Sequence, residues 1–150
     1  MKLTFLGTGT STGVPSIACD CETCTSDDPR DKRLRVSVLI EHAGQTVIVD
    51  TSTDFRQQAL LYGLKHLDAV LVTHCHADHI FGLDDIRPLN FRHGALGLYA
   101  NERALEYVEE LKPKRTYFTH ITHEVKHERD SKLLPEGVEW AYDGLVVNDE

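Results

Sequence analysis

The sequence predicts one layered α/β domain, with separate α+β layers as the close variant, over residues 1–150. Two observations lead to this class. Short β-rich runs alternate with segments of helical periodicity, which is the pattern of sheets covered by helices. A chain of 150 residues with 41% hydrophobic and 27% charged residues also has the size and composition of a single globular domain. No internal repeat, low-complexity tract or interdomain linker divides it.

Composition and charge exclude several classes of function. The net charge of −8 offers no evident basic face for non-specific nucleic-acid binding, so nucleic acid is not the partner we expect. No window approaches the roughly 18 consecutive apolar residues of a membrane helix, and Met1-Lys2 leads into a strand-like run instead of a signal peptide. We therefore expect a cytoplasmic protein with no membrane partner.

The N-terminal elements are expected to be strands. Residues 2–6 form a strand pattern that runs into the glycine-rich loop GTGTSTG at 7–13. This loop fits neither phosphate-binding fingerprint, so it indicates a tight turn at which the backbone passes close to a site, with a phosphate loop as the weaker alternative. The β-rich runs at 36–41 and 46–49 are separated by a short turn and predict a hairpin. Asp50 ends the second of these runs.

A helix and a strand follow the hairpin. Residues 52–62 have helical periodicity, with Ser52 or Thr53 as the N-cap and Gly63 as the C-terminal stop. The continuous apolar run within 68–72 predicts a strand that is covered on both faces.

The remaining predicted elements are shorter and alternate in type. They are a helical piece ending near Pro88, a strand at 96–99, a helix at 101–111, a strand at 116–119, a polar helix at 123–133 and two strands within 138–147.

A cluster of metal-binding residue types directly follows the strand at 68–72. The motif THCHADH places His74, His76, Asp78 and His79 within six positions. The two histidines at 74 and 76 lie on one face of an extended chain, and the next two residues fall where the chain turns into a helix. Imidazoles with a carboxylate suit zinc, manganese or iron, and such a metal makes water nucleophilic at neutral pH. The alternative is a solvated polar loop.

Three cysteines form a second cluster. Cys19, Cys21 and Cys24 fall within six residues, and in a reducing compartment such thiols favour metal binding over disulfides. The fourth, Cys75, lies between two histidines of the first cluster and is expected to point the other way, as a small buried thiol.

THCHADH resembles the HxHxDH signature of the metallo-β-lactamase superfamily of binuclear metal hydrolases. Several other stretches resemble the branch that contains the phosphoribosyl cyclic phosphodiesterase of the phosphonate pathway. They are LTFLGTGTSTGVP, the CDCETC loop, VIVDTSTDFRQQ, LDAVLVTHCHADHIFGLDDIRPL, KRTYFTHITHE and LPEGVEWAYDG. The resemblance implies the αββα sandwich of that superfamily and a zinc or manganese catalytic centre.

The resemblance also implies residue roles. The catalytic metals would be held by His74, His76, Asp78, His79 and His120, with Asp78 also orienting the attacking water and Asp50 supporting the ligands by hydrogen bonds. His123 would join Cys19, Cys21 and Cys24 to hold a structural zinc. Three thiolates and one imidazole suit a closed tetrahedral site of this kind.

The chain departs from the family pattern by being short. A complete double-sheet domain of this type is expected to have roughly 200–250 residues, and the sequence indicates an internal deletion near residues 100–108, so that the sandwich is incomplete. The absent segment would supply a third histidine for the first metal, a bridging carboxylate and a general-acid histidine. Conceivable substitutes are His93, His127, Asp84 and Asp85, each of which is ordinarily a solvated loop or helix residue; His42 and His66 have no visible partner.

The function that we predict is a metal-dependent hydrolase of the cyclic phosphodiesterase type, acting on a small-molecule phosphodiester and impaired by its missing ligands. One alternative is a non-catalytic zinc-binding remnant of the fold. Another is an enzyme like the tRNA 3′-processing endonuclease, which would need an RNA-gripping arm and a basic surface. Whether a partner chain, as in a homodimer, completes the site is left open.

Overall fold

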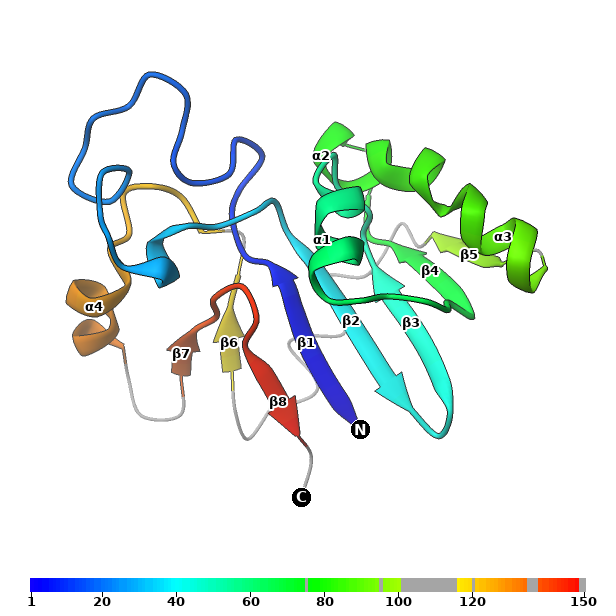
Figure 1. The fold of residues 1–150 in the computed structure, drawn as a ribbon. Helices are drawn as coiled ribbons and strands as arrows, with labels where there is room; N and C mark the ends of the chain where they lie inside the picture. The colour runs from blue at the N-terminus through cyan, green and yellow to red at the C-terminus, as the bar shows by residue number, and fades with distance from the viewer. Residues whose placement is uncertain (75, 95, 101–115, 120, 135–137, 149–150) are drawn as a thin grey trace.

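The computed structural model describes residues 1–74, 76–94, 96–100, 116–119, 121–134 and 138–148. Its main sheet has six strands in the order β5-β4-β3-β2-β1-β8 (Figure 1). Their bounds are β1 Lys2–Gly7, β2 Ser37–His42, β3 Gln45–Val49, β4 Ala69–Val72, β5 Gly97–Ala100 and β8 Val146–Asn148. A second sheet pairs β6 (Thr116–Phe118) with β7 (Val138–Trp140) in parallel. The predicted mixture of strands and helices is confirmed.

The antiparallel half of the main sheet contains β8, β1, β2 and β3. β2 and β3 form the predicted hairpin, and their turn places Ala43 and Gly44 at φ 49° and 79°. Positive φ at both central residues is the turn geometry that matches the twist of two antiparallel strands. β3 therefore runs away from the hairpin turn and ends at Val49, directly before Asp50.

The other half of the sheet is parallel, because β3 pairs with β4 and β4 with β5 in the same direction. The connections are helical: α1 (Phe55–Leu61) joins β3 to β4, and α2 (Ala77–Ile80), a 3₁₀ turn at Phe81–Ile86 and α3 (Arg87–His93) join β4 to β5. Figure 1 shows α1 and α3 on the same face of the sheet. Parallel strands need crossovers of this kind.

The main core lies between this sheet and α1. It contains Leu6, Leu39, Ile48, Phe55, Leu67 and Val70, each no more than 7% exposed. The prediction that β4 is covered on both faces is wrong, because Val70 is fully buried whereas Leu71, its neighbour on the opposite face, is 36% exposed. An apolar run alone does not distinguish cover on one face from cover on two.

Several predicted boundaries also differ. Pro88 lies in the first turn of α3 and therefore begins a helix instead of ending one, which is the position where a missing N–H costs nothing. α1 begins at Phe55 with Asp54 at its N-cap, later than predicted, and ends before Gly63 at φ 65°. The two C-terminal strands form but do not pair with each other.

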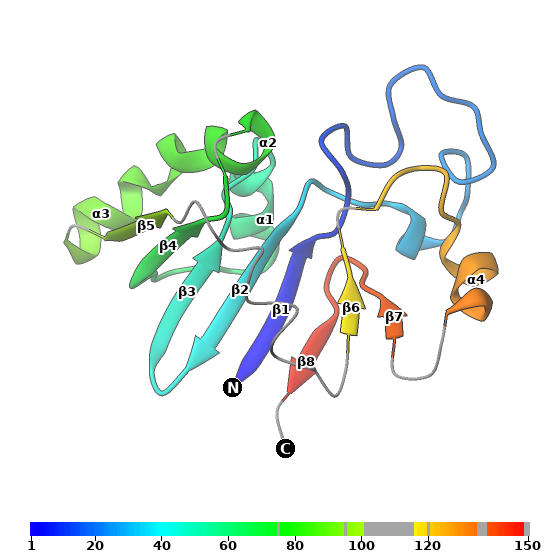
Figure 2. The ribbon, with the colours of Figure 1, turned by 180° about the vertical axis from the view of Figure 1, so that it is seen from behind.

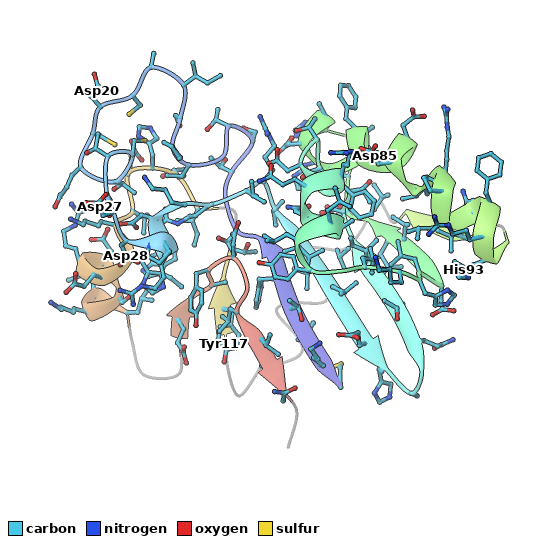
Figure 3. All side chains as sticks on the ribbon, in the orientation of Figure 1. Asp20, Asp27, Asp28, Asp85, His93 and Tyr117 are labelled. Carbon is cyan, nitrogen blue, oxygen red and sulfur yellow. The ribbon has the colours of Figure 1, made fainter. Side chains whose placement is uncertain are left out.

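The second sheet approaches the first at β1. The rings of Phe5 in β1 and Tyr117 in β6 have centroids 6.0 Å apart, and Figures 2 and 3 show β6 and the labelled Tyr117 beside β1 and β8. Two layers of sheet thus meet through aromatic side chains at this end of the molecule.

A separate group of loops contains the cysteines and α4 (His127–Asp130). The predicted polar helix over 123–133 is confirmed only in part, because α4 is followed by a 3₁₀ turn at Ser131–Leu133 and residues 121–126 are not helical. The glycine-rich loop enters this group. A Cβ on Gly7 would lie 2.0 Å from the Arg35 carbonyl oxygen, so glycine permits the close approach of β1 to the segment before β2.

The predicted helix at 101–111 and the deletion inferred near 100–108 lie outside the described residues. None of the helices in the described part of the chain has the length and apolar character needed to cross a bilayer.

Candidate metal centres

Asp50 and the HxHxDH motif meet at one edge of the main sheet. Asp50 directly follows β3, and Thr73 and His74 directly follow the neighbouring parallel strand β4. The carboxyl ends of parallel strands lie at the same edge, so the topology brings these residues together. Asp50 has φ 59°, a left-handed conformation that aspartate adopts more readily than most residues. It is only 4% exposed.

The Asp50 carboxylate is surrounded by donors. Oδ1 accepts a hydrogen bond from the Thr73 backbone N–H at 2.8 Å, and Oδ2 accepts one from the Thr73 hydroxyl at 2.7 Å. Oδ2 also accepts from Nδ1 of His79 at 2.7 Å. These three bonds satisfy a buried charge and fix the His79 ring, with Nδ1 as the donor and Nε2 on the opposite edge.

The four motif residues His74, His76, Asp78 and His79 are called the strand-end cluster below. The ring centroids of His74 and His79 are 3.9 Å apart, and those of His74 and His76 are 4.7 Å apart. Nε2 of His79 lies 3.3 Å from Oδ2 of Asp78. Desolvation lowers the pKa of His74, and nearby positive charge on His79 and His76 lowers it further, which favours the neutral imidazole.

The strand-end cluster lines a cavity of about 440 Å³. The other residues that line it are Asp50, Thr73, Ser11, Thr119 and the valines Val36, Val38 and Val49. The lining therefore combines nitrogen and oxygen ligand groups with three valine side chains from β2, β3 and the segment before β2, which are called the apolar floor below.

Close packing holds the helical side of the cluster in place. The Thr51 backbone N–H donates to the His79 carbonyl at 2.8 Å, and the Gly82 N–H donates to the Thr51 carbonyl at 2.9 Å. A Cβ on Gly82 would lie 2.2 Å from the Ser52 carbonyl oxygen, so only glycine permits this approach. These hydrogen bonds and this close approach fix the position of the turn after β3 relative to the turn that carries Asp78 and His79.

The donor set of the strand-end cluster fits a divalent metal. Three imidazoles and a carboxylate are ligands that zinc and manganese accept, and the Asp50 contact leaves Nε2 of His79 facing away from the carboxylate that anchors the ring. His120, which the sequence predicts as a further ligand, and Cys75 lie outside the described residues. Their predicted roles stay predictions.

The second candidate centre is the cysteine cluster, formed by Cys19, Cys21, Cys24 and His123. The possible ligand atoms of these residues all lie within 4.8 Å of one another. The Sγ atoms of Cys19 and Cys21 are each 3.3 Å from Nδ1 of His123. The structure thus brings His123 to the cysteine loop across about 100 residues of sequence, as the family resemblance implies.

The thiols of the cysteine cluster differ in acidity. A hydrogen bond with His123 lowers the pKa of Cys21 to about 6, whereas burial raises the pKa of Cys24 to about 11. Thiolate is the form that binds metal, so Cys21 is better prepared for a metal than Cys24. In a tetrahedral zinc site with bonds of about 2.0–2.3 Å, the ligand atoms lie roughly 3.5–3.8 Å apart. The two Sγ–Nδ1 distances of 3.3 Å are close to this spacing.

The conceivable substitutes for missing ligands do not join the strand-end cluster among the described residues. Asp84, Asp85 and His93 do not line the cavity of the strand-end cluster, and Figure 3 shows His93 at the end of α3 that lies away from α2. His127 is only 8% exposed, so its interpretation as a solvated residue is wrong. Its backbone N–H donates to Asp31, which draws the start of α4 inward. His42 is exposed.

Sequence reasoning missed one contact of a residue that it named, His66, and missed one residue of interest, Thr73. His66 has a partner in Asp68, at 3.0 Å, although none was visible in the sequence. Thr73 contacts both Asp50 and His74 through its hydroxyl. Its place directly before the first motif histidine, at the end of a strand, is the signal that could have identified it.

Comparisons with known proteins agree with this arrangement. Residues 45–117 match the family model described as "Beta-lactamase superfamily domain". The chain is 49% identical over 111 residues to an octanoyltransferase of Porphyromonas gingivalis, an alignment that covers 73% of this chain and 22% of that protein. It is 29% identical over 104 residues to a ribonuclease Z of Archaeoglobus fulgidus, covering 66% of this chain and 29% of that protein. The chain thus spans less than a third of either curated relative.

A solved structure matches nearly the whole chain. It is a diphosphatase from the PhnP family, with a TM-score of 0.87 and 33% identity, and the match covers 97% of this chain and 96% of that chain. With the sheet order, the strand-end cluster and the matching domain model, this likeness decides the classification. The chain belongs to the metallo-β-lactamase superfamily of hydrolases and, within it, to the PhnP family.

Proposed function

We propose that the chain is a divalent-metal-dependent phosphodiesterase, of the type that opens cyclic phosphodiesters, with its reaction at the strand-end cluster. The observation that carries the proposal is the cavity of about 440 Å³ in which these ligands meet an apolar floor. The similar solved structure is described as a diphosphatase, so phosphorus-centred hydrolysis is also supported by a relative.

The residues have distinct roles in this proposal. His74, His76, Asp78 and His79 would hold metal, with His120 as a further ligand. A divalent metal there would polarise a phosphoryl oxygen and lower the pKa of a water molecule. Asp50 holds His79 in one orientation, and the carboxylate of Asp78 would orient the attacking water by accepting its hydrogen bond. The valine floor receives the apolar part of the ester group.

The cysteine cluster has a structural role in the proposal. Cys19, Cys21, Cys24 and His123 would bind zinc with no open position, which suits stability more than catalysis. This zinc would join the N-terminal loop to the segment that follows β6.

Turnover is expected to be weak and selective. Without the general-acid histidine that the family resemblance assigns to the absent segment, a poor leaving group would depart unaided, a loss of typically ~10²–10⁴-fold. Aryl phosphodiesters need no such proton and their rings suit the apolar floor. We therefore expect slow hydrolysis of bis(4-nitrophenyl) phosphate and much slower hydrolysis of a five-membered cyclic phosphate, measured with added zinc or manganese.

The decisive variant is His79→Ala, with His42→Ala as its matched control because His42 is exposed on the distant hairpin. We expect His79→Ala to abolish turnover of the aryl ester and His42→Ala to leave it unchanged. Equal turnover by wild type and His79→Ala would contradict the proposal, and absence of turnover by the wild type would favour the zinc-binding remnant. The endonuclease alternative predicts cleavage of a tRNA precursor, which the net charge of −8 does not favour.

A further inference from the structure

The Thr73 hydroxyl lies between Asp50 and His74. Its Oγ1 is 2.7 Å from Oδ2 of Asp50 and 3.0 Å from Nδ1 of His74. The same Asp50 oxygen accepts from Nδ1 of His79 at 2.7 Å. Two histidine rings of the strand-end cluster are thus linked to a single buried carboxylate, one directly and the other through a hydroxyl.

The directions of these hydrogen bonds follow from proton counting. An ionised carboxylate only accepts, so the single hydroxyl proton of Thr73 is donated to Asp50. The hydroxyl oxygen then has only lone pairs to offer His74, which must donate from Nδ1–H. If the hydroxyl donated to His74 instead, two lone pairs would face each other across 2.7 Å between Thr73 and Asp50.

We propose that Thr73 is a positioning residue that fixes His74 with its proton on Nδ1, so that Asp50 orients two metal-binding histidines instead of one. Both rings then carry their lone pair on Nε2, on the edge away from Asp50, and that of His79 lies 3.3 Å from Oδ2 of Asp78, as two ligand atoms of one metal would. The proposal rests on the proposed function only for the identity of the group that these lone pairs bind. The contacts themselves belong to the metal-free chain.

The variant pair that tests this relay is Thr73→Val and Thr73→Ser. Valine keeps the shape of threonine and the backbone N–H that Asp50 accepts, but it removes the hydroxyl; serine retains the hydroxyl. Thr12→Val, in the exposed part of the glycine-rich loop, is the control for the same chemical change elsewhere.

The first measurement is the tautomer of His74 by ¹⁵N NMR of protein in which only the cysteine cluster carries zinc. We expect the Nδ1–H form in wild type, Thr73→Ser and Thr12→Val, and a mixture of both tautomers in Thr73→Val. An Nε2–H form of His74 in the wild type, or an unchanged tautomer in Thr73→Val, would overturn the relay.

The second measurement is Mn²⁺ affinity by calorimetry, since carboxylate and imidazole bind manganese whereas thiolates prefer zinc. Loss of a hydrogen-bond partner behind a ligand typically weakens metal binding about 10–100-fold. We expect that loss in Thr73→Val and recovery to within a few-fold of wild type in Thr73→Ser. Equal affinity in all variants contradicts the relay. Absence of Mn²⁺ binding by the wild type would instead contradict the proposed function, and the tautomer measurement would still decide the relay.

Discussion

Replacing Arg33 by methionine is expected to lower the free energy of unfolding by about 3–5 kcal/mol, the usual cost of removing one partner of a buried ion pair. The Arg33 and Asp31 side chains are both fully buried, with Nη2 of Arg33 2.9 Å from Oδ1 of Asp31. The guanidinium also donates to the carbonyls of Arg30, Thr122 and Val125. The substitution therefore strands a carboxylate and three carbonyl groups.

The substitution should also destabilise the cysteine cluster, because Thr122 and Val125, whose carbonyls Arg33 binds, flank His123. Urea unfolding of Arg33→Met measures the loss, and Lys2→Met is the control. Lys2 forms an exposed ion pair with Glu41, with both side chains more than 40% exposed, and such pairs contribute only about 0–1 kcal/mol. Equal losses in the two variants would show that the buried pair has no special role.

Cys21→Ser is expected to remove zinc from the cysteine cluster and to lower Tm by about 10–20 °C. Structural zinc sites release about 10–16 kcal/mol on binding in small peptides, and each 1 kcal/mol lost lowers Tm by about 2–4 °C in a chain of this size. Loss of even part of the zinc-binding free energy therefore lowers Tm by a large amount. Zinc content by mass spectrometry and Tm by calorimetry are the two readouts.

The matched control for Cys21→Ser is Ile17→Ser, because Ile17 is in the same loop and 100% exposed. It should change neither zinc content nor Tm. If Cys21→Ser retains the zinc content and Tm of wild type, the cysteine cluster does not hold a structural zinc.

The sequence predicts those parts of the fold that depend on local signals. The hairpin of β2 and β3 follows from alternating β-rich runs and a turn with glycine, and the strand-end cluster follows from ligand types placed directly after a strand. Pro88 illustrates the limit, because proline stops one helix and starts the next with equal ease. The conformation of the backbone before the proline decides which of these two outcomes occurs.

Long-range contacts could be predicted only through family resemblance. Nothing in the local pattern brings His123 to the cysteine loop. The buried pair of Arg33 with Asp31 lies in the charged stretch 27–35, where nothing local marks it as buried, because a charge is buried only where partners from distant segments satisfy it. His127, in a polar helix, was misjudged for the same reason. The role of the Thr73 hydroxyl could not be predicted from the sequence, since it depends on two hydrogen-bond distances.

The central claim is that the chain holds metal at two separate clusters, one structural and one open to substrate. Metal content per chain of desalted wild type, Cys21→Ser and His79→Ala, after incubation with zinc, tests it most directly. We predict that each variant loses a different part of the wild-type metal, with a large fall in Tm for Cys21→Ser and a smaller one for His79→Ala, which loses the hydrogen bond to the buried Asp50. A folded His79→Ala variant with the full metal content of wild type would contradict the claim.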